Sequence, residues 1–370
     1  MKRSSSLQFE MLETRFTPAV ILSGGVLTVD GTGGDDTIVV SVSGSNALVT
    51  LNSIPTTVPL IKINSVRING LGGDDTTTYT LNKNVTVNGG DGDDTTTLNG
   101  SANATFVGGI GNDTMTSNMT GVVKATGGLG NDTITASGAK SVYLTGDDGN
   151  DTLTATTLGP AVIKGGTNDD TITCNTSRNA TIRGETGNDN LNCNSVGFAN
   201  MDGGSGNDTI NCTANRNVTL KGQGGNDAIS CDVVGIATII GSTGNDTISC
   251  VAAKANIRGD SGNDNITFST TGLATVTGGT EDDIILGIGV GNANINGGAD
   301  NDLITGSLGH NVIHGGTGND AIVGRGNPSD FLFGDGDADT LQATAGASRL
   351  YVDKFDIIIV PRLIDTIIHV

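Results

Sequence analysis

Aspartate recurs at one position of a short glycine-rich string along most of the chain. The last residue of Gly-Asn-Asp, or of a close variant, is aspartate in sixteen copies. From Asp75 onward the copies are 19 residues apart, apart from two steps of 18, and the first step, from Asp36, is 39. Carboxylate and carbonyl oxygens in such turns are the ligands that hard divalent cations prefer. The aspartates are Asp36, Asp75, Asp94, Asp113, Asp132, Asp151, Asp170, Asp189, Asp208, Asp227, Asp246, Asp264, Asp283, Asp302, Asp320 and Asp339.

A period near 19 residues predicts the elements that position these aspartates. It is too short for repeats of helical hairpins and suits a β-solenoid. An apolar residue stands two positions after most of the aspartates, as in Ile134, and others stand seven and nine positions before them, as in Ile163 and Ala161. Polar residues alternate with these, which indicates two short strands per coil. We therefore expect an all-β fold, a right-handed parallel β-roll of about sixteen coils over residues 25–343.

The composition excludes several classes of protein. The formal net charge is −20, which disfavours nucleic acid and anionic membranes as partners. Aromatic residues make up 3% of the chain, too few for an ordinary globular core, and no apolar run is long enough for a transmembrane helix. Catalytic motifs such as H-E-x-x-H or G-x-S-x-G are absent, so we expect no enzymatic activity.

Stacking the coils creates an electrostatic problem that a cation would solve. Strands in a sheet are about 4.8 Å apart, so neighbouring aspartates in the column would repel by roughly 3.5 kcal/mol at an effective dielectric of 20. A file of such charges requires a counter-ion or protonation. Ca²⁺ fits better than Mg²⁺, which demands a tight octahedron. The alternative is that Asn-Asp and Gly-Asp serve only as turn residues.

The fullest copies of the motif resemble those of a known family. They read GGIGNDTMT, GGLGNDTIT, GGSGNDTIN and GGTGNDAIV, beginning at Gly108, Gly127, Gly203 and Gly315. They are similar to the nonapeptide G-G-x-G-x-D-x-U-x of the RTX, or hemolysin-type, calcium-binding repeats. The resemblance implies several Ca²⁺ ions held between neighbouring turns by the sixteen aspartate side chains. It also implies that carbonyl oxygens at the second and fourth motif positions, such as Gly128 and Gly130, complete the coordination.

This sequence departs from the RTX pattern in the second half of each coil. Where a second aspartate is expected, nine residues before the first, most coils have Ala or Val, and only Asn311 and Asp330 keep a trace of the motif. We therefore predict one calcium edge and a dry opposite edge. Other residues replace the fourth-position glycine in a few coils, which puts the geometry of those turns in doubt. They are Asn168, Glu281, Asp300 and Asp337.

Two further columns carry chemically distinctive side chains. All five cysteines stand four residues after an aspartate, at Cys174, Cys193, Cys212, Cys231 and Cys250, and we expect a buried ladder rather than disulfides. Thr-x-Thr recurs on the outward face of six successive coils and resembles the face of ice-binding β-solenoids. This makes an ice- or polysaccharide-binding module the alternative function. The pairs are Thr76/Thr78, Thr95/Thr97, Thr114/Thr116, Thr133/Thr135, Thr152/Thr154 and Thr171/Thr173.

The two ends differ from the repeats. Residues 1–24 are predicted to be a leader or N-terminal cap, and Phe9 to Ala19 resembles a leader found on extracellular proteins of planctomycete-type bacteria. Residues 344–370 are apolar and are predicted to be a cap or a C-terminal export signal. Extracellular calcium is at millimolar levels, at which weak sites fill. We therefore expect a secreted or surface-associated calcium-binding protein with a structural or adhesive role and possible contacts to surface or matrix polysaccharide.

Overall fold

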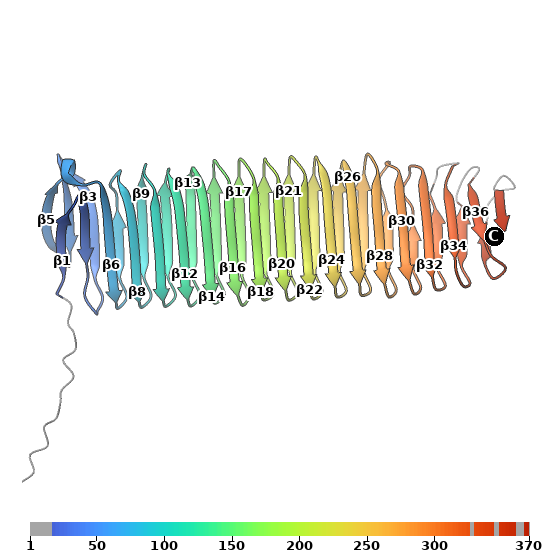
Figure 1. Cartoon of the computed structure of the whole chain (residues 1–370), viewed down its shortest axis with the longest axis horizontal. Coiled ribbons are helices and arrows are strands. Elements are labelled where there is room, and N and C mark those ends of the chain that lie inside the picture. The colour runs from blue at the N-terminus through green and yellow to red at the C-terminus, as the bar shows by residue number, and fades with distance from the viewer. Residues whose placement is uncertain (1–16, 326–328, 344–347, 360–365, 370) are drawn as a thin grey trace, which may run out of the picture.

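The computed structural model describes residues 17–325, 329–343, 348–359 and 366–369. The chain forms a straight rod in which strands lie side by side along the long axis, from the N-terminal end to the C-terminal end (Figure 1). It is an all-β parallel solenoid of about fifteen turns, and each coil contributes one strand to each of two sheets. The predicted fold class is confirmed.

Within the described residues, sheet A contains nineteen strands, of which all but β1 are parallel. Most of its strands are seven or eight residues long. They are β1 (Ala19–Ser23), β2 (Val26–Asp30), β6 (Ser65–Gly72), β8 (Asn84–Asp91), β10 (Ala104–Ile110), β12 (Val122–Leu129), β14 (Ser141–Asp148), β16 (Ala161–Thr167), β18 (Ala180–Thr186), β20 (Ala199–Ser205), β22 (Val218–Gly224), β24 (Ile236–Thr243), β26 (Lys254–Ser261), β28 (Ala274–Thr280), β30 (Ala293–Ala299), β32 (Asn311–Thr317), β34 (Phe331–Asp335), β36 (Arg349–Val352) and β38 (Thr366–His369).

Sheet B contains the other strands, which begin directly after the aspartates from β7 onward. They are β3 (Thr37–Ser43), β4 (Asn46–Leu51), β5 (Ile54–Pro59), β7 (Thr76–Tyr79), β9 (Thr95–Gly100), β11 (Thr114–Met119), β13 (Thr133–Ala139), β15 (Thr152–Thr157), β17 (Thr171–Thr176), β19 (Asn190–Ser195), β21 (Thr209–Ala214), β23 (Ala228–Val233), β25 (Thr247–Ala252), β27 (Asn265–Thr270), β29 (Ile284–Gly287), β31 (Leu303–Thr305), β33 (Ala321–Gly324), β35 (Thr340–Ala343) and β37 (Ile357–Ile359).

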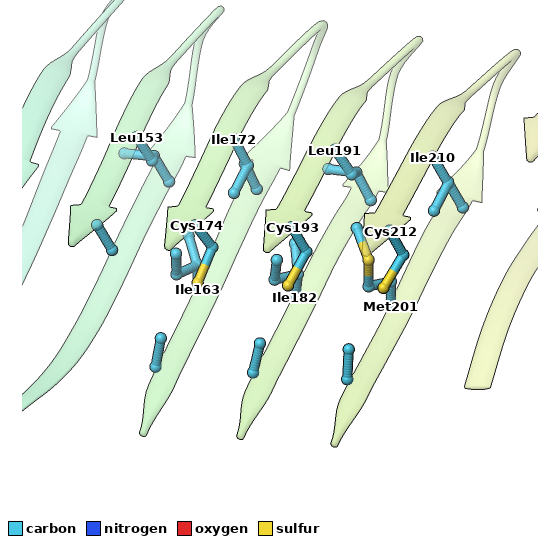
Figure 2. Packing of buried hydrophobic residues seen from close by; sticks show 14 of the residues in the cluster. Leu153, Ile163, Ile172, Cys174, Ile182, Leu191, Cys193, Met201, Ile210 and Cys212 are labelled. Carbon is cyan, nitrogen blue, oxygen red and sulfur yellow. The ribbon is translucent and has the colours of Figure 1, made fainter. Parts of the chain in front are cut away.

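The core is a thin stack of aliphatic side chains between the two sheets. Neighbouring coils pair residue for residue at the repeat spacing, for example Ile134 with Leu153 and Ile163 with Ile182. The apolar columns expected from the sequence are buried, and Figure 2 shows Ile172, Ile182 and Cys174 packed in the space between the sheets. Period-2 alternation places every second side chain of each strand inside.

The 39-residue first step is an insertion and not a coil that has lost its motif. β2 pairs directly with β6, and β3 pairs directly with β7, so these elements belong to adjacent coils. The extra residues form β4 and β5, which extend sheet B, with β4 pairing antiparallel with β3 and β5 with β4. β1 pairs antiparallel with β2 at the same end of sheet A. The short 3₁₀ helix Leu60–Lys62 follows β5.

Parallel pairing continues past residue 343 at the other end. β36 and β38 extend sheet A, and β37 extends sheet B. The predicted leader, Phe9 to Ala19, lies almost entirely outside the described residues. Within the described ranges, no helix is both long enough and apolar enough to cross a membrane.

Candidate metal centre

The sixteen predicted aspartates lie in one column inside the solenoid. They occupy the aspartate edge, which we define as the connection from each sheet A strand to the next sheet B strand. Each side chain shares its inward direction with the buried residue two positions later, which is apolar in all coils except those with Thr77 and Thr96. All sixteen are only 1% to 3% exposed. The structure therefore brings the whole predicted set together, and it buries the carboxyl groups beside the apolar core.

From Asp75 onward, one oxygen of each carboxylate accepts a hydrogen bond from the preceding coil. The main-chain N–H of Asp113 donates to Oδ1 of Asp132 at 2.7 Å, and the N–H of Asp132 donates to Oδ1 of Asp151 at 2.7 Å. The same bond links every successive pair from Asp36 to Asp339. Because each bond fixes the side chain, the carboxylates form an ordered file along the rod.

The second oxygen has no partner in fifteen members of the file. Oδ2 of every aspartate from Asp75 to Asp339 is buried and accepts no hydrogen bond. A buried, unpaired carboxylate oxygen is costly, and such groups are rare in folded proteins. Fifteen of them in one register require either protonation or a positively charged partner.

Glycine at the first motif position makes room beside each unpaired oxygen. A Cβ placed on Gly127 would lie 2.0 Å from Oδ2 of Asp132 and 2.7 Å from the carbonyl oxygen of Gly146 in the next coil. Contacts this short exclude every residue with a side chain. We call the space beside the first-position glycine of each coil the glycine cradle. It is bordered by one carboxylate oxygen and by one carbonyl oxygen from the next coil.

Further carbonyl oxygens point from coil to coil at the second and fourth motif positions. A Cβ on Gly128 would lie 2.1 Å from the carbonyl oxygen of Gly109, and one on Gly130 would lie 2.1 Å from that of Gly111. The non-glycine residues at the fourth position keep a left-handed backbone, with φ of 74° at Asn168 and 72° at Glu281. The turn is therefore retained in the coils whose geometry the sequence left in doubt.

Burial strongly disfavours the charged form of these carboxylates. Desolvation raises the pKa of Asp132 to about 7 and that of Asp283 to about 8, against an ordinary value of 3.8. The hydrogen bond from the preceding coil lowers the pKa, and the charges of neighbouring aspartates raise it further. For the ionised form to persist at neutral pH, the file needs positive charge close to Oδ2.

The donor set suits Ca²⁺. All the candidate ligands are carboxylate or carbonyl oxygens, which are the ligands of hard cations. In the described part of the chain, no three His, Cys, Asp or Glu side chains converge on one point. A cation between two adjacent turns would therefore have fewer than three such side-chain ligands, and main-chain carbonyls of those turns are further candidate ligands.

The ends of the file are closed by protein hydrogen bonds. Oδ2 of Asp36 accepts bonds from the N–H and hydroxyl of Thr32, and its Oδ1 accepts one from the Asn52 side chain. At the other end, Asp356 accepts the N–H of Asp339 at 3.1 Å and that of Asp353 at 2.7 Å. Sequence reasoning missed Asp356 because it lies in an apolar tail without the glycine motif; the isoleucine two residues later was the available signal.

A second, exposed ladder runs beside the buried file in the opposite direction. At the fifth motif position, the N–H of Asn131 donates to Oδ1 of Asn112, and the N–H of Asn150 donates to Oδ1 of Asn131. Here the later coil donates to the earlier one. Asn and Asp serve equally well as acceptors, which explains why both occur at this position.

On the opposite edge, the inward-facing column where a second aspartate would stand is apolar, except near the C-terminal end. Val123, Val142 and Ala161 are buried where a second aspartate would stand. In the last coils Asn311 and Asp330 are buried, and Oδ1 of Asp330 accepts the N–H of Asn311 at 2.8 Å while its Oδ2 has no partner. The trace of the motif in the sequence thus corresponds to one more unpaired buried carboxylate oxygen.

The cysteine and threonine columns lie as expected. All five thiols are buried and free of disulfides, and Cys231 Sγ lies 3.2 Å from Cys250 Sγ. The Thr-x-Thr pairs are in register on the outer face of sheet B, for example Thr114 with Thr133 and Thr152 with Thr171.

Comparison with known proteins agrees with this geometry. The model of the RTX calcium-binding nonapeptide repeat matches the chain in four copies, over residues 126–157, 200–211, 234–249, 288–325 and 329–352. No curated protein matches the chain. The chain is therefore a β-solenoid that carries the calcium-binding nonapeptide repeats of the RTX family.

Proposed function

We propose that this chain is an extracellular, non-enzymatic calcium-binding rod with a structural or adhesive role, whose fold is completed by Ca²⁺ ions along the aspartate edge. One observation carries the proposal. Fifteen aspartates in register each bury an oxygen that accepts no hydrogen bond from the protein.

The ligands proposed for Ca²⁺ are Oδ2 of Asp75 through Asp339, together with main-chain carbonyls of the two turns that flank each ion. Asp36 stays a predicted ligand from its place in the column, although its oxygens already accept protein hydrogen bonds. The bound ions supply positive charge, which removes both the desolvation cost and the mutual repulsion of the file.

The proposed location follows from the same chemistry. Without calcium, the buried carboxylates disfavour stacking of the coils at neutral pH, and extracellular calcium allows the coils to stack. An exported chain would therefore remain unfolded before export and fold outside the cell. The absence of enzymatic activity is proposed because the buried acids are already bonded into the file and because the family's repeats are structural.

A calcium titration tests the proposal. Protein stripped with EGTA is titrated with Ca²⁺ while far-UV circular dichroism and heat are recorded. We expect a cooperative coil-to-β transition, with about one ion bound for each pair of neighbouring turns. A chain that is fully folded in EGTA and binds no calcium would refute it.

The flat threonine face supports a second candidate function. Six Thr-x-Thr pairs are stacked in register, which gives a regular, outward array on sheet B. Such an array suits ice or a polysaccharide. Replacing Thr114, Thr133 and Thr152 by Leu should abolish ice shaping or glycan retention while calcium-dependent folding persists. Unchanged binding by this variant would remove the candidate.

A further inference from the structure

The edge opposite the aspartates has a pattern that repeats every second coil. We call the connection from each sheet B strand to the next sheet A strand the second edge. One of its columns reads Gly121, Lys140, Gly159, Arg178, Gly197, Arg216 and Gly235, so a cation alternates with a glycine. Coils are about 4.8 Å apart, which places the cations about 10 Å apart along the rod.

The glycines keep the space between the cations open. A Cβ on Gly197 would lie 2.6 Å from the carbonyl carbon of Arg178, and one on Gly235 would lie 2.6 Å from that of Arg216. Each glycine thus packs tightly on the backbone of the preceding cation and adds no side chain. The edge consequently presents gaps between long basic side chains.

From Gly159 to Gly235, the glycine coils carry exposed apolar residues where the cationic coils carry the polar Ser177 and Asn215. Leu158, Val196 and Val234 stand immediately before the glycines and are 70%, 52% and 70% exposed. Phe198 follows Gly197, is 45% exposed, and has the Arg216 guanidinium 5.5 Å from its ring centre. Apolar and cationic patches therefore alternate along the edge.

Arg178, Phe198 and Arg216 line one groove of about 450 Å³, and Leu158 and Val196 line it too. The backbone of this groove is firmly placed. The Arg178 N–H donates to Thr176 Oγ1 at 3.1 Å, its carbonyl accepts from Ser195 Oγ at 2.5 Å, and the Phe198 N–H donates to Asn179 Oδ1 at 3.1 Å. Throughout the described residues, neither arginine forms an ion pair with a carboxylate.

We propose that this groove binds an acidic polysaccharide whose carboxylate-bearing sugars alternate with neutral ones. Arginine binds carboxylates bidentately, and an exposed aromatic ring packs on the apolar face of a sugar. A sugar ring in an extended glycan advances by about the length of one coil, so charges on alternate sugars match cations on alternate coils. The site is separate from the aspartate edge and does not depend on which residues bind calcium.

Binding of fluorescently labelled hyaluronan to the calcium-saturated full chain tests the proposal by anisotropy. The double variant Arg178→Ala/Arg216→Ala should weaken binding by roughly tenfold, since two solvent-exposed charge pairs are lost. Lys62→Ala/Arg67→Ala removes the same charge from exposed positions elsewhere and should change it little. Phe198→Ala should weaken binding without changing its dependence on salt.

Circular dichroism and bound calcium must be equal for all four proteins, so that a folding defect is recognised. If the groove variant and the control variant bind equally well, attraction is by net charge alone and the site is refuted. Equal binding of hyaluronan and uncharged dextran would also overturn it. If calcium does not fold the chain, the proposed function is refuted. The groove proposal is tested separately, by comparing hyaluronan binding of the folded parent chain with that of the arginine variants.

Discussion

Replacing Asp170 by Asn should raise the stability of the fold in the absence of calcium and lower it in the presence of calcium. The Asn side chain keeps an oxygen for the N–H of Asp151, which donates to Asp170 Oδ1 at 2.8 Å. In place of the unpaired Oδ2 it puts an amide group, on the side where the carbonyl oxygen of Gly184 also borders the Gly165 cradle. A donor there suits the calcium-free state and repels a cation.

The magnitude follows from the carboxyl group itself. Burial raises the pKa of Asp170 from 3.8 to about 7, so keeping it ionised in the calcium-free fold at pH 8 costs up to about 4 kcal/mol. In EGTA, Asp170→Asn should therefore raise the free energy of unfolding by as much as this. In calcium the variant should be less stable than the parent, because the ions on either side lose a charged ligand.

Asp169→Asn is the matched control. Asp169 is exposed one residue earlier, and its Oδ1 accepts the Asn188 N–H at 2.7 Å, a bond that an amide oxygen also makes. The change in charge is the same, and we expect less than about 0.5 kcal/mol in either condition. At pH 8, far-UV circular dichroism measures the urea unfolding of all three proteins in calcium and the folded fraction of each protein in EGTA. The reasoning is refuted if Asp170→Asn loses stability in EGTA or if the two variants behave alike.

Three other perturbations give distinct results. In EGTA, the free energy of unfolding should be greatest below pH 4 and should fall as pH rises through 6 to 8. The reason is that the fold raises the pKa of carboxyls such as Asp94 to about 6 and Asp283 to about 8. A melting temperature in EGTA that increases with pH would contradict this. The five buried thiols should resist a thiol reagent in the calcium-loaded chain and all react once it unfolds, and rapid labelling of the folded chain would show that the ladder is open. Ile182→Ala should cost about 2 to 5 kcal/mol, because the side chain is fully buried, whereas Thr181→Ala on the outer face of the same strand should cost far less in the same urea assay.

The repeat made much of the fold predictable. A period of 19 residues, with apolar residues at fixed offsets, determines two strands per coil and the inward columns, as Ile134 and Ile163 show. The in-register aspartate column followed from the same period. The sequence did not distinguish an insertion from a lost motif before Asp75, because both add one period of length; only the pairing of β3 with β7 separates them.

The orientation of the carboxylates could not be predicted from spacing. A turn aspartate can point outward to water or inward to a cation, and the structure shows Oδ1 tied to the preceding coil and Oδ2 left unpaired. Asp356 was not predicted because it joins the aspartate column by accepting the N–H of Asp339, and not through the glycine motif. The two-coil alternation on the second edge was missed because a period of 38 is hidden beneath the stronger period of 19.

The length of the unpaired file has a consequence for the electrostatic behaviour of the whole molecule. Each Ca²⁺ adds two positive charges, so the formal net charge of −20 is cancelled before all fifteen unpaired carboxylates hold an ion of their own. As calcium rises, the rod passes through neutrality and then becomes a cation. Its direction of migration in an electric field would reverse, and its solubility would be lowest at partial loading, where neutral rods no longer repel one another.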